Sequence, residues 1–482
     1  MSQHLNEEVA IFPVTVAKPS KLSTLWQDLR EALRGSEQDF TEGSLGRAIM
    51  LLAIPMVLEM VMESIFAVCD VFFVARLGAD AVATVGLTES IITLVYAVAI
   101  GLSMGTTAMV ARRIGEKDRE GAVVIAVQAI AAGIVLALPI AAAGIFFAPE
   151  ILTLMGASAS IISSGAGYTA VLLGGNVTIM LLFLINAVFR GAGDAAVAMR
   201  VLWVANAINV VLDPCLIFGL GPFPELGVQG AAIATTVGRG IGVLFQLYLL
   251  FRGRGRIRLT RANLKVNPAV MWQLLRVSLG GVFQILIATA SWVGLTRIIA
   301  EFGSEALAGY TIAIRIIIFA LLPSWGLSNA AATLVGQNLG AKKPERAEKS
   351  VWLTSFGNML FLGSVAIIFI LYAPHLIAIF TSVPVIAAYA VDCLRIVSYG
   401  YLFYAFGMVV EQAFNGAGDT YTPTLINLGC YWLLQIPLAY SLAIPLQFGP
   451  QGVFWAITVA ESALAVVSII IFRRGRWKTK QV

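Results

Sequence analysis

The sequence predicts an all-α membrane protein with twelve transmembrane helices in two related six-helix lobes. Three observations lead to this fold class. The chain of 482 residues is 59% hydrophobic and only 12% charged, a composition that is typical of a polytopic membrane protein. Its apolar segments are long enough to cross a hydrocarbon core about 30 Å thick. The second half of the chain also repeats motifs of the first half.

Hydropathy and helix-breaking residues divide the chain into twelve apolar segments. Each segment is flanked by glycine, proline or charged residues, as expected where a helix leaves the membrane. The predicted spans are residues 46–76, 80–112, 121–147, 160–189, 195–219, 226–252, 268–301, 304–337, 346–372, 384–414, 420–446 and 449–473.

The spans define the predicted organisation of the chain. The stretch KLSTLWQDLREALRG within the N-terminal tail places leucines and Trp26 on one face, which suits either a helix on the membrane surface or a solvated helix. The predicted units are a tail at 1–43, a first lobe at 44–252, a basic linker at 253–267, a second lobe at 268–473 and a tail at 474–482.

Most of the 32 lysines and arginines lie in the two tails and in the connections that follow even-numbered spans. Positively charged loops stay in the cytoplasm, so we expect both termini to be cytoplasmic in an inner or plasma membrane. Basic stretches such as RGRGRIRLTR follow this topology, which disfavours binding to nucleic acid.

Three repeated motifs relate the two halves. FRGAGDA at 189–195 recurs as FNGAGDT at 414–420, an offset of 225, and the stretch around Gly115 and Lys117 recurs around Gly340 and Lys342 at the same offset. GVQGAAIAT at 227–235 recurs as GPQGVFWAIT at 449–458, an offset of 222. The halves therefore have the same orientation, and such halves pack around a cavity between or within them.

The first predicted span carries three carboxylates, Glu59, Glu63 and Asp70. A helical period of about 100° per residue places all three on one face. A charge inside a membrane is unfavourable by a few kcal/mol even on lenient scales, so such residues usually face a cavity and serve binding or transport.

The repeat separates acids of the scaffold from acids of a site, because a residue needed only for the scaffold tends to occur in both halves. The acids of the first half fail this test. Their counterparts are apolar: Leu295 for Asp70, Ala288 for Glu63, Ile314 for Glu89 and, at an offset of 223, Ile436 for Asp213. This asymmetry points to a function in the first half.

Counting residues places Asp70 and Asp213 at similar depths, about 9 Å inside the outer helix ends. Asn209 lies one turn deeper on the face of Asp213. Carboxylates that meet in a low-dielectric site do not all remain charged, so the site holds a proton, or a sodium ion with Asn and Thr oxygens. The alternative is a structural pairing with buried arginine, for which Arg239 is the candidate for Glu59 or Glu63.

The cysteine and histidine content of the chain and its lack of a phosphate-loop motif argue against several other kinds of site. Cys69, Cys215, Cys393 and Cys430 form no CxxC pair, and the chain has only two histidines. Zinc and disulfide frameworks are therefore disfavoured. No Gly-Lys dipeptide occurs, so there is no phosphate-binding loop of the GxxxxGK[ST] type. We expect no enzyme activity and no cofactor apart from H⁺ or Na⁺ as a coupling ion.

These motifs together resemble the multidrug and toxic compound extrusion (MATE) family over essentially all twelve spans. The likeness rests on IPMVLEMVMESIFAVCDVFFVARLG, on the NxxxDP of ANAINVVLDPCLIFGLG, on GVQGAAIAT and on the doubled GAGD. The resemblance implies a V-shaped pair of lobes and a monomer that exports small amphipathic, often cationic compounds in exchange for protons or sodium.

The resemblance also implies roles for residues of the first lobe. Asp70 resembles the aspartate in the first helix of the prokaryotic members, and Pro55 the proline at which that helix bends. The remaining implied cation-site residues are Asn209, Asp213, Thr235, Tyr168 and Asn186. A sodium ion would be held by Asp70, Asn209, Asp213 and Thr235. Asn186 lies only about 8 Å from the inner helix end, so the fourth helix would have to bend to bring it to Asp213.

The chain departs from the members that use a cation site in the second lobe. Those members have a glutamate in the seventh helix, where this chain has Gln284. A site there would rest on Glu411, the counterpart of Asn186. Glu59, Glu63, Glu89, Glu411 and Gln284 are therefore secondary candidates. A lipid-intermediate or metabolite exporter of related architecture remains the alternative function, and a membrane enzyme or scaffold is disfavoured.

Overall fold

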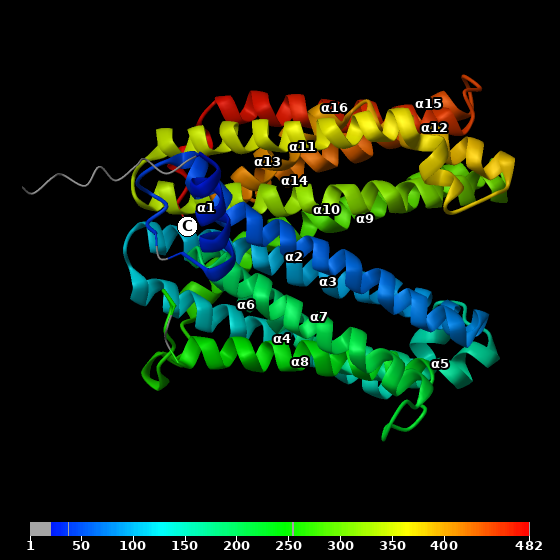
Figure 1. Ribbon diagram of the computed structural model, residues 1–482, viewed down its shortest axis with the longest axis horizontal. Helices are drawn as coiled ribbons and strands as arrows, with labels where there is room; N and C mark the ends of the chain where they lie inside the picture. The colour runs from blue at the N-terminus through cyan, green and yellow to red at the C-terminus, as the bar shows by residue number, and fades with distance from the viewer. Residues whose placement is uncertain (1–20, 37, 253–254, 482) are drawn as a thin grey trace, which may run out of the picture.

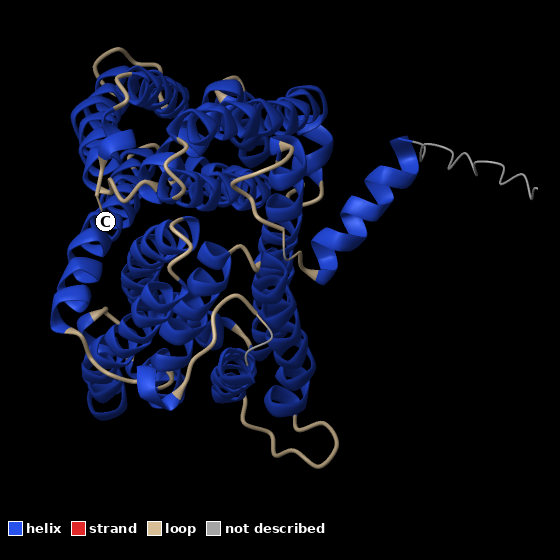
Figure 2. Ribbon diagram, turned by 90° about the vertical axis from the view of Figure 1, so that its left-hand side faces the viewer, coloured by secondary structure: helices blue, strands red, loops and turns tan. Residues whose placement is uncertain are grey.

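A computed structural model describes residues 21–36, 38–252 and 255–481. Within these ranges the elements are helices joined by loops, without strands (Figure 2). Part of the predicted N-terminal tail, residues 1–20, and part of the predicted linker, residues 253–254, lie outside the described residues.

The first lobe is built from α2 to α8. Its elements are α2 (Leu45–Val74), which η1 (Ala75–Leu77) extends, α3 (Ala79–Gly115), α4 (Arg119–Leu154), α5 (Ala159–Gly174), α6 (Asn176–Ala192), α7 (Ala195–Phe218) and α8 (Val228–Arg252). Helix α1 (Lys21–Arg34) precedes them and runs across the direction of the other helices (Figure 2).

The second lobe is built from α9 to α16. After η2 (Arg261–Asn263) its elements are α9 (Pro268–Ala300), α10 (Ser304–Gly340), α11 (Pro344–Ala378), α12 (Pro384–Ser398), α13 (Tyr401–Gly416), α14 (Tyr421–Asn427), a π-helical segment η3 (Leu428–Gln435), α15 (Ile436–Ala443), α16 (Pro450–Arg473) and η4 (Arg476–Thr479).

The predicted number of spans is confirmed for the described part of the chain. Eleven of its helices are long and apolar enough to cross a membrane, and the bent pair α12–α13 makes twelve. The pair is bent by 59°. Large exposed side chains such as Leu154 and Leu360 face outward from the bundle, as suits helices that lie in an apolar medium.

The two lobes form a V (Figure 1). They converge at the end of the bundle that carries α1 and the C-terminus, here called the terminal side, and diverge at the opposite end, the far side. Helices α3 and α9 meet closely at the convergence. A Cβ atom at Gly101 would collide with Val282, and one at Gly105 would collide with Ser278. Glycine thus allows backbones to approach where side chains would hold the lobes apart.

A close backbone contact at glycine recurs, with pseudo-twofold symmetry, at the ends of α3 and α10. A Cβ at Gly115 would overlap the backbone of Gln337, and a Cβ at Gly340 would overlap the backbone of Arg112. We call these two reciprocal contacts the glycine seam. The turn after each helix places a lysine in the left-handed region, with φ 62° at Lys117 and 59° at Lys342.

Four spans depart from regular α-helix. The third is kinked at Phe147 within α4. The fourth breaks at Gly175, between α5 and α6, and the tenth between α12 and α13. The eleventh contains η3, in which the hydrogen bonds span five residues. Pro437 lies at the start of α15, just after η3, and lacks the N–H that a regular helix needs there. These irregularities bring polar side chains from α13, η3 and α16 together in the second lobe.

A strap on the terminal side joins the two lobes. It comprises residues 36–43 without residue 37. Its backbone carbonyls accept hydrogen bonds from Arg256 of the linker, from Lys343 just before α11 and from Arg346 of α11. Burial alone would raise the pKa of Asp39 in this strap, but hydrogen bonds from Thr41 and the charges of Lys117 and Arg256 lower it overall.

Candidate functional site

The first-lobe aspartates lie on α2 and α7, and both are buried. Asp213 has no exposed surface, and Asp70 retains 9% of its surface. The two carboxylates are close enough to interact electrostatically. The expected neighbours assemble at Asp213, since the Asn209 side-chain nitrogen donates to Asp213 Oδ1 at 3.4 Å and to Thr235 Oγ1 of α8 at 3.1 Å.

Two oxygens in this cluster lack a hydrogen-bond donor among the described residues. They are Asn209 Oδ1 and Asp213 Oδ2, and both are buried. A buried oxygen without a donor is unfavourable, and it becomes satisfied when a proton or a cation binds to it. Carboxylate, amide and hydroxyl oxygens, such as those of Asp213, Asn209 and Thr235, are ligands of the kind that a hard cation prefers.

Tyr168 and Glu89 surround the cluster at longer range. Tyr168 of α5 is buried and interacts electrostatically with Asp70. Glu89 of α3 interacts electrostatically with Asp70 but is itself exposed, and it also interacts with Arg315 on α10 of the other lobe. Glu89 thus faces the space between the lobes.

Glu59 belongs to a separate buried cluster. Its carboxylate pairs with Arg190 of α6 at 2.8 Å and accepts a hydrogen bond from Asn186 at 3.1 Å. Asn186 accepts in turn from Gln246 of α8. The hydrogen bonds of Asn186 therefore tie it to Glu59, and none of those described reaches Asp70 or Asp213. The fourth span does break, but at Gly175, well before Asn186 in the chain.

Arg239 pairs with Glu63 and not with Glu59. The Arg239 guanidinium lies 3.9 Å from the Glu63 carboxylate, which also accepts a hydrogen bond from Asn206 at 3.2 Å. The rings of Phe66 and Tyr96 lie 5.5 and 5.7 Å from this cation. Glu63 and Glu59 are thus both neutralised by arginine in the described structure, as the structural alternative expected.

Pro55 lies inside α2, which continues as one helix from Leu45 to Val74. The residue is buried, and the backbone of the adjacent Met56 lies directly against Gly326 of α10. A change of backbone shape at Pro55 would therefore alter the contact between Met56 of α2 and Gly326 of α10, which joins the lobes. A hinge at this position stays a prediction.

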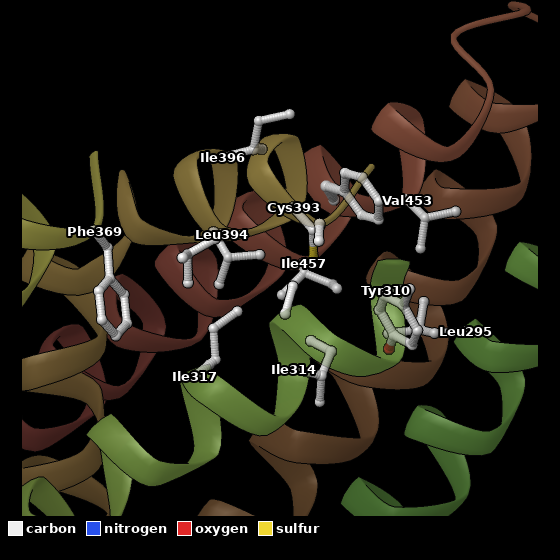
Figure 3. Close-up of a cluster of buried hydrophobic side chains, with 14 of the residues drawn as sticks. Leu295, Tyr310, Ile314, Ile317, Phe369, Cys393, Leu394, Ile396, Val453 and Ile457 are labelled. Atoms are coloured by element: carbon white, nitrogen blue, oxygen red, sulfur yellow. The ribbon is translucent and has the colours of Figure 1, made fainter. Parts of the chain in front are cut away.

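The equivalent region of the second lobe is hydrophobic (Figure 3). Leu295 and Ile314, the counterparts of Asp70 and Glu89, are both buried in one apolar cluster. The same offsets relate Tyr168 to Cys393 and Thr235 to Ile457, which lie in this cluster as well, and Ile436 packs against it. The second lobe thus fills with side chains the place where the first lobe assembles polar groups.

The acids of the second lobe lie elsewhere. Glu411 of α13 and Glu461 of α16 face each other closely enough to repel. Gln284 of α9 is buried and exchanges hydrogen bonds of 3.0 and 3.2 Å with Asn415. It lines the same cavity as Glu411.

Three cavities of about 190, 220 and 150 Å³ adjoin the paired acids of the first lobe and the acids of the second lobe, and none of them is lined by Asp70 or Asp213. The first lies between the lobes, with Glu63 and Arg190 on one side and Gln412 and Asn415 on the other. The other two lie in the second lobe. Trp325 of α10 lines all three, so the cavities share one wall.

Sequence reasoning missed Arg190, Glu461 and Trp325 as site residues. Arg190 lies in the FRGAGDA motif, where its nearness to Glu59 across 131 residues has no local signal. Glu461 was visible as the counterpart of Arg239, a charge reversal that marked the position. Trp325 carried no signal, because one tryptophan in an apolar span is ordinary.

Comparisons with known proteins agree with the overall fold. The family model described as MatE matches residues 55–215 and 282–441. A curated relative, "Probable multidrug resistance protein NorM" of Thermotoga maritima, is 28% identical over 90% of this chain and 94% of its own length. A second, "FAD transporter" of Shewanella oneidensis, is 24% identical over 89% of this chain and 95% of its own length.

A solved structure described as an "Outward-facing conformation of a multidrug resistance MATE family transporter of the MOP superfamily" is similar in three dimensions. It has a TM-score of 0.86 and 27% identity, and the match covers 92% of this chain and 100% of that chain. The family match extends over both lobes and over the repeated motifs. The chain therefore belongs to the MatE family, whose members are membrane transporters and not enzymes.

Proposed function

We propose that the protein is a secondary-active exporter that exchanges small amphipathic cations for protons or sodium ions. The coupling ion binds at Asp70 and Asp213, with Asn209 and Thr235 completing its shell and Tyr168 adjacent. The observation that carries this proposal is the pair of buried oxygens without donors, Asn209 Oδ1 and Asp213 Oδ2, beside a second buried carboxylate.

Coupling requires that the ion bind two conformations with different affinity, since otherwise a gradient transfers no energy. Ion binding draws the carboxylates of α2 and α7 together. Because α2 contacts α10 through Met56 and Gly326, a change of shape at Pro55 reaches the second lobe. Export follows when this change releases substrate from the cavity of about 190 Å³ between the lobes, here called the central cavity.

The orientation is part of the same proposal. Both termini are cytoplasmic, and the membrane is the inner or plasma membrane. The chain acts as a monomer. Its units are the tail 1–43, the first lobe 44–252, the linker 253–267, the second lobe 268–473 and the tail 474–482. The positive charge on the terminal side supports this orientation. The V would then open to the outside, and the similar solved structure is described as an outward-facing conformation of that protein.

The lining of the central cavity supports amphipathic substrates. Met60, Met104, Phe183 and Trp325 supply flexible and aromatic surface, and the Glu63 carboxylate in the same lining is paired with Arg239. Thioether and aromatic groups adapt to ligands of different shape. The Thermotoga relative is named as a multidrug resistance protein, which agrees with a broad substrate range.

Export of a metabolite or lipid intermediate is the second candidate. The Shewanella relative is named as an FAD transporter. Such cargo is anionic. The cavity of Glu411 and Glu461 offers it no cationic side chain among the described residues that line it, and Arg190 of the central cavity is already paired with Glu59. The charge of the cavities therefore favours a cation.

Transport into and out of proteoliposomes tests the proposal. A fluorescent organic cation is loaded, and a pH or sodium gradient is imposed in separate experiments. We expect efflux driven by at least one gradient and lost in Asp70→Asn and Asp213→Asn. Normal efflux by correctly inserted variants would refute the coupling site, and gradient-driven export of an anionic nucleotide would favour the second candidate.

A further inference from the structure

A cavity of about 340 Å³ on the terminal side of the first lobe is lined by the end of α1 and by α7 and α8. Its lining combines two arginines, Arg34 of α1 and Arg200 of α7, with the apolar side chains of Val197, Phe245 and Leu249. None of these residues lines the central cavity or belongs to the coupling site. The cavity thus has a cationic part and an apolar part, and the proposed exchange uses neither.

The close approach of α1 to α7 brings the two arginines to one site. Gly35 follows α1 with φ 93°, in the left-handed region that glycine adopts readily. A Cβ atom at Gly35 would lie 3.9 Å from a terminal nitrogen of Arg200, so the Arg200 guanidinium lies against the turn that follows Arg34. Two cationic side chains from different helices therefore line the same cavity.

The described side chains do not balance the positive charge of this cavity. Among the described residues, no carboxylate pairs with Arg34 or Arg200, and Arg200 Nε donates to the Ala196 carbonyl at 3.1 Å. The carboxylate in the lining is that of Asp194, which lies 3.9 Å from the Arg256 guanidinium and accepts a hydrogen bond of 3.2 Å from the Arg256 backbone N–H. Arg256 thus compensates Asp194, and the charges of Arg34 and Arg200 remain to meet an anion.

The apolar part of the cavity lies on the outward surface of the bundle. Phe245 is 38% exposed, Leu249 is half-buried, and the neighbouring Leu244 and Tyr248 of α8 are exposed too. An outward apolar surface on a membrane helix contacts the fatty chains of lipids. A lipid chain can therefore reach the cavity from the bilayer, next to the two arginines.

Helix α1 lies as a helix at the membrane surface would. It projects sideways from the bundle, across the direction of the spanning helices (Figure 2). Ion pairs of 2.9 and 2.6 Å from Arg47 of α2 to Asp28 and Glu31 hold it to the first lobe. Trp26 is 69% exposed, and exposed tryptophan is typical of the boundary between lipid chains and head groups. The cavity at the end of α1 therefore lies at the depth of the head groups.

An anionic phospholipid has the chemistry that both parts of the cavity recognise. Guanidinium groups bind phosphate oxygens through paired, charge-assisted hydrogen bonds. A fatty chain is stabilised by burial against an apolar wall. A zwitterionic lipid brings its own cation to the arginines, and a free phosphate ion has no chain, so each of these satisfies only part of the site.

We propose that this cavity binds one anionic phospholipid from the membrane leaflet on the terminal side, with Arg34 and Arg200 as ligands of its phosphate and Phe245 and Leu249 against its chain. The inference goes beyond the proposed exchange and does not rest on it. It requires only that the bundle lies in a membrane and that the cavity carries this charge.

Binding to the purified, delipidated full-length protein in detergent, without any gradient, tests the assignment. The probes are dioctanoyl phosphatidylglycerol, dioctanoyl phosphatidylcholine and inorganic phosphate, and native mass spectrometry gives the dissociation constant of the first bound lipid. We expect phosphatidylglycerol to bind several-fold more tightly than phosphatidylcholine. Arg34→Gln and Arg200→Gln should each weaken phosphatidylglycerol binding about fivefold, because each removes one attractive charge at the membrane surface.

The matched control is Arg474→Gln. Arg474 follows α16 on the terminal side, is exposed and does not line the cavity. This variant removes the same charge from the protein and should bind phosphatidylglycerol unchanged. Phe245→Ser should weaken the binding of both lipids several-fold, because it removes part of the apolar wall.

Arg34→Lys and Arg200→Lys guard against loss of fold, since each keeps the charge and should bind phosphatidylglycerol better than the corresponding Gln variant. Equal affinity for phosphatidylglycerol in the wild type and both Gln variants would overturn the inference, as would equal affinity of the wild type for the two lipids. Displacement of phosphatidylglycerol by inorganic phosphate at the same concentration would assign the site to a free ion and overturn it too. The measurement involves no gradient, so the proposed function is judged separately, by efflux in Asp70→Asn and Asp213→Asn.

Discussion

The two lobes share a backbone plan but place their buried charges at different points. In the first lobe Asp70 and Asp213 lie where the second lobe has Leu295 and Ile436. At a second pair of positions the first lobe has the ion pair Glu59–Arg190, whose counterparts at an offset of 225 are Gln284 and Asn415, joined by two neutral hydrogen bonds.

A third position reverses charge. Arg239 of the first lobe corresponds to Glu461 of the second, and each lies beside a tyrosine, Tyr96 or Tyr404. The repeat therefore conserves the helices, while the buried side chains at equivalent positions differ in polarity or in charge. The two lobes thus hold their buried charges in different places.

The largest effect is expected when the first-lobe site is made as neutral as its counterpart. Asp70→Asn and Asp213→Asn each remove a carboxylate that the coupling ion needs, so gradient-driven efflux should fall by about a hundredfold or more. Proteoliposome efflux measures the loss. Asp80→Asn, which alters an exposed acid at the start of α3, is the control and should transport normally.

The ion pair Glu59–Arg190 can be exchanged for the amide pair of the second lobe. Glu59→Gln or Arg190→Asn alone leaves a buried charge without its partner, and each should lower stability by about 3–5 kcal/mol. The double variant removes both charges and should recover most of that loss. Thermal unfolding in detergent completes the double-mutant cycle, and additive losses would contradict the pairing.

The glycine seam tests whether the lobes contribute equally. Gly115→Ala and Gly340→Ala each force a methyl group against backbone of the other lobe, so each should lower stability by about 1–3 kcal/mol. Similar values for both sites would agree with their symmetry, and a large difference would contradict it. Gly357→Ala, on an open face of α11 with no atom near the added methyl group, is the control.

The smallest effect is expected from Thr235, whose counterpart is Ile457. Thr235→Val keeps the shape of the side chain but removes the oxygen that accepts from Asn209, a contribution of about 1 kcal/mol. Efflux should then need a several-fold higher concentration of coupling ion. Thr296→Val on the exposed face of α9 should leave this concentration unchanged, and an unaltered Thr235→Val would remove Thr235 from the ion shell.

The sequence allowed the twelve spans, the two lobes and the shared helix face of Asn209 and Asp213 to be predicted, whereas Thr235 was implied as their neighbour only by the family resemblance. Hydropathy fixes the spans, and residues four apart on a helix face the same way, so these features depend on local pattern. The repeat then marked Asp70 and Asp213 together with Glu63 and Glu89, because the counterparts of all four are apolar.

The partners of Glu59 and Glu63 could not be predicted in the same way. Arg239 was a candidate for either, and the choice depends on how α6 and α8 rotate about their axes, which hydropathy does not record. The break of the tenth span and the π-helical segment of the eleventh depend on packing too. The Glu411–Glu461 cavity exists because of these irregularities, so its acids appeared in the sequence as isolated residues.

The glycine seam bears on how fast the transporter cycles. Backbone packs against backbone there, so no side chain can rotate to let the lobes separate by degrees. Each lobe supplies one glycine, and opening the terminal side must release both contacts together. We therefore expect the change of access to be a single activated step with a steep dependence on temperature, rather than a gradual drift between conformations.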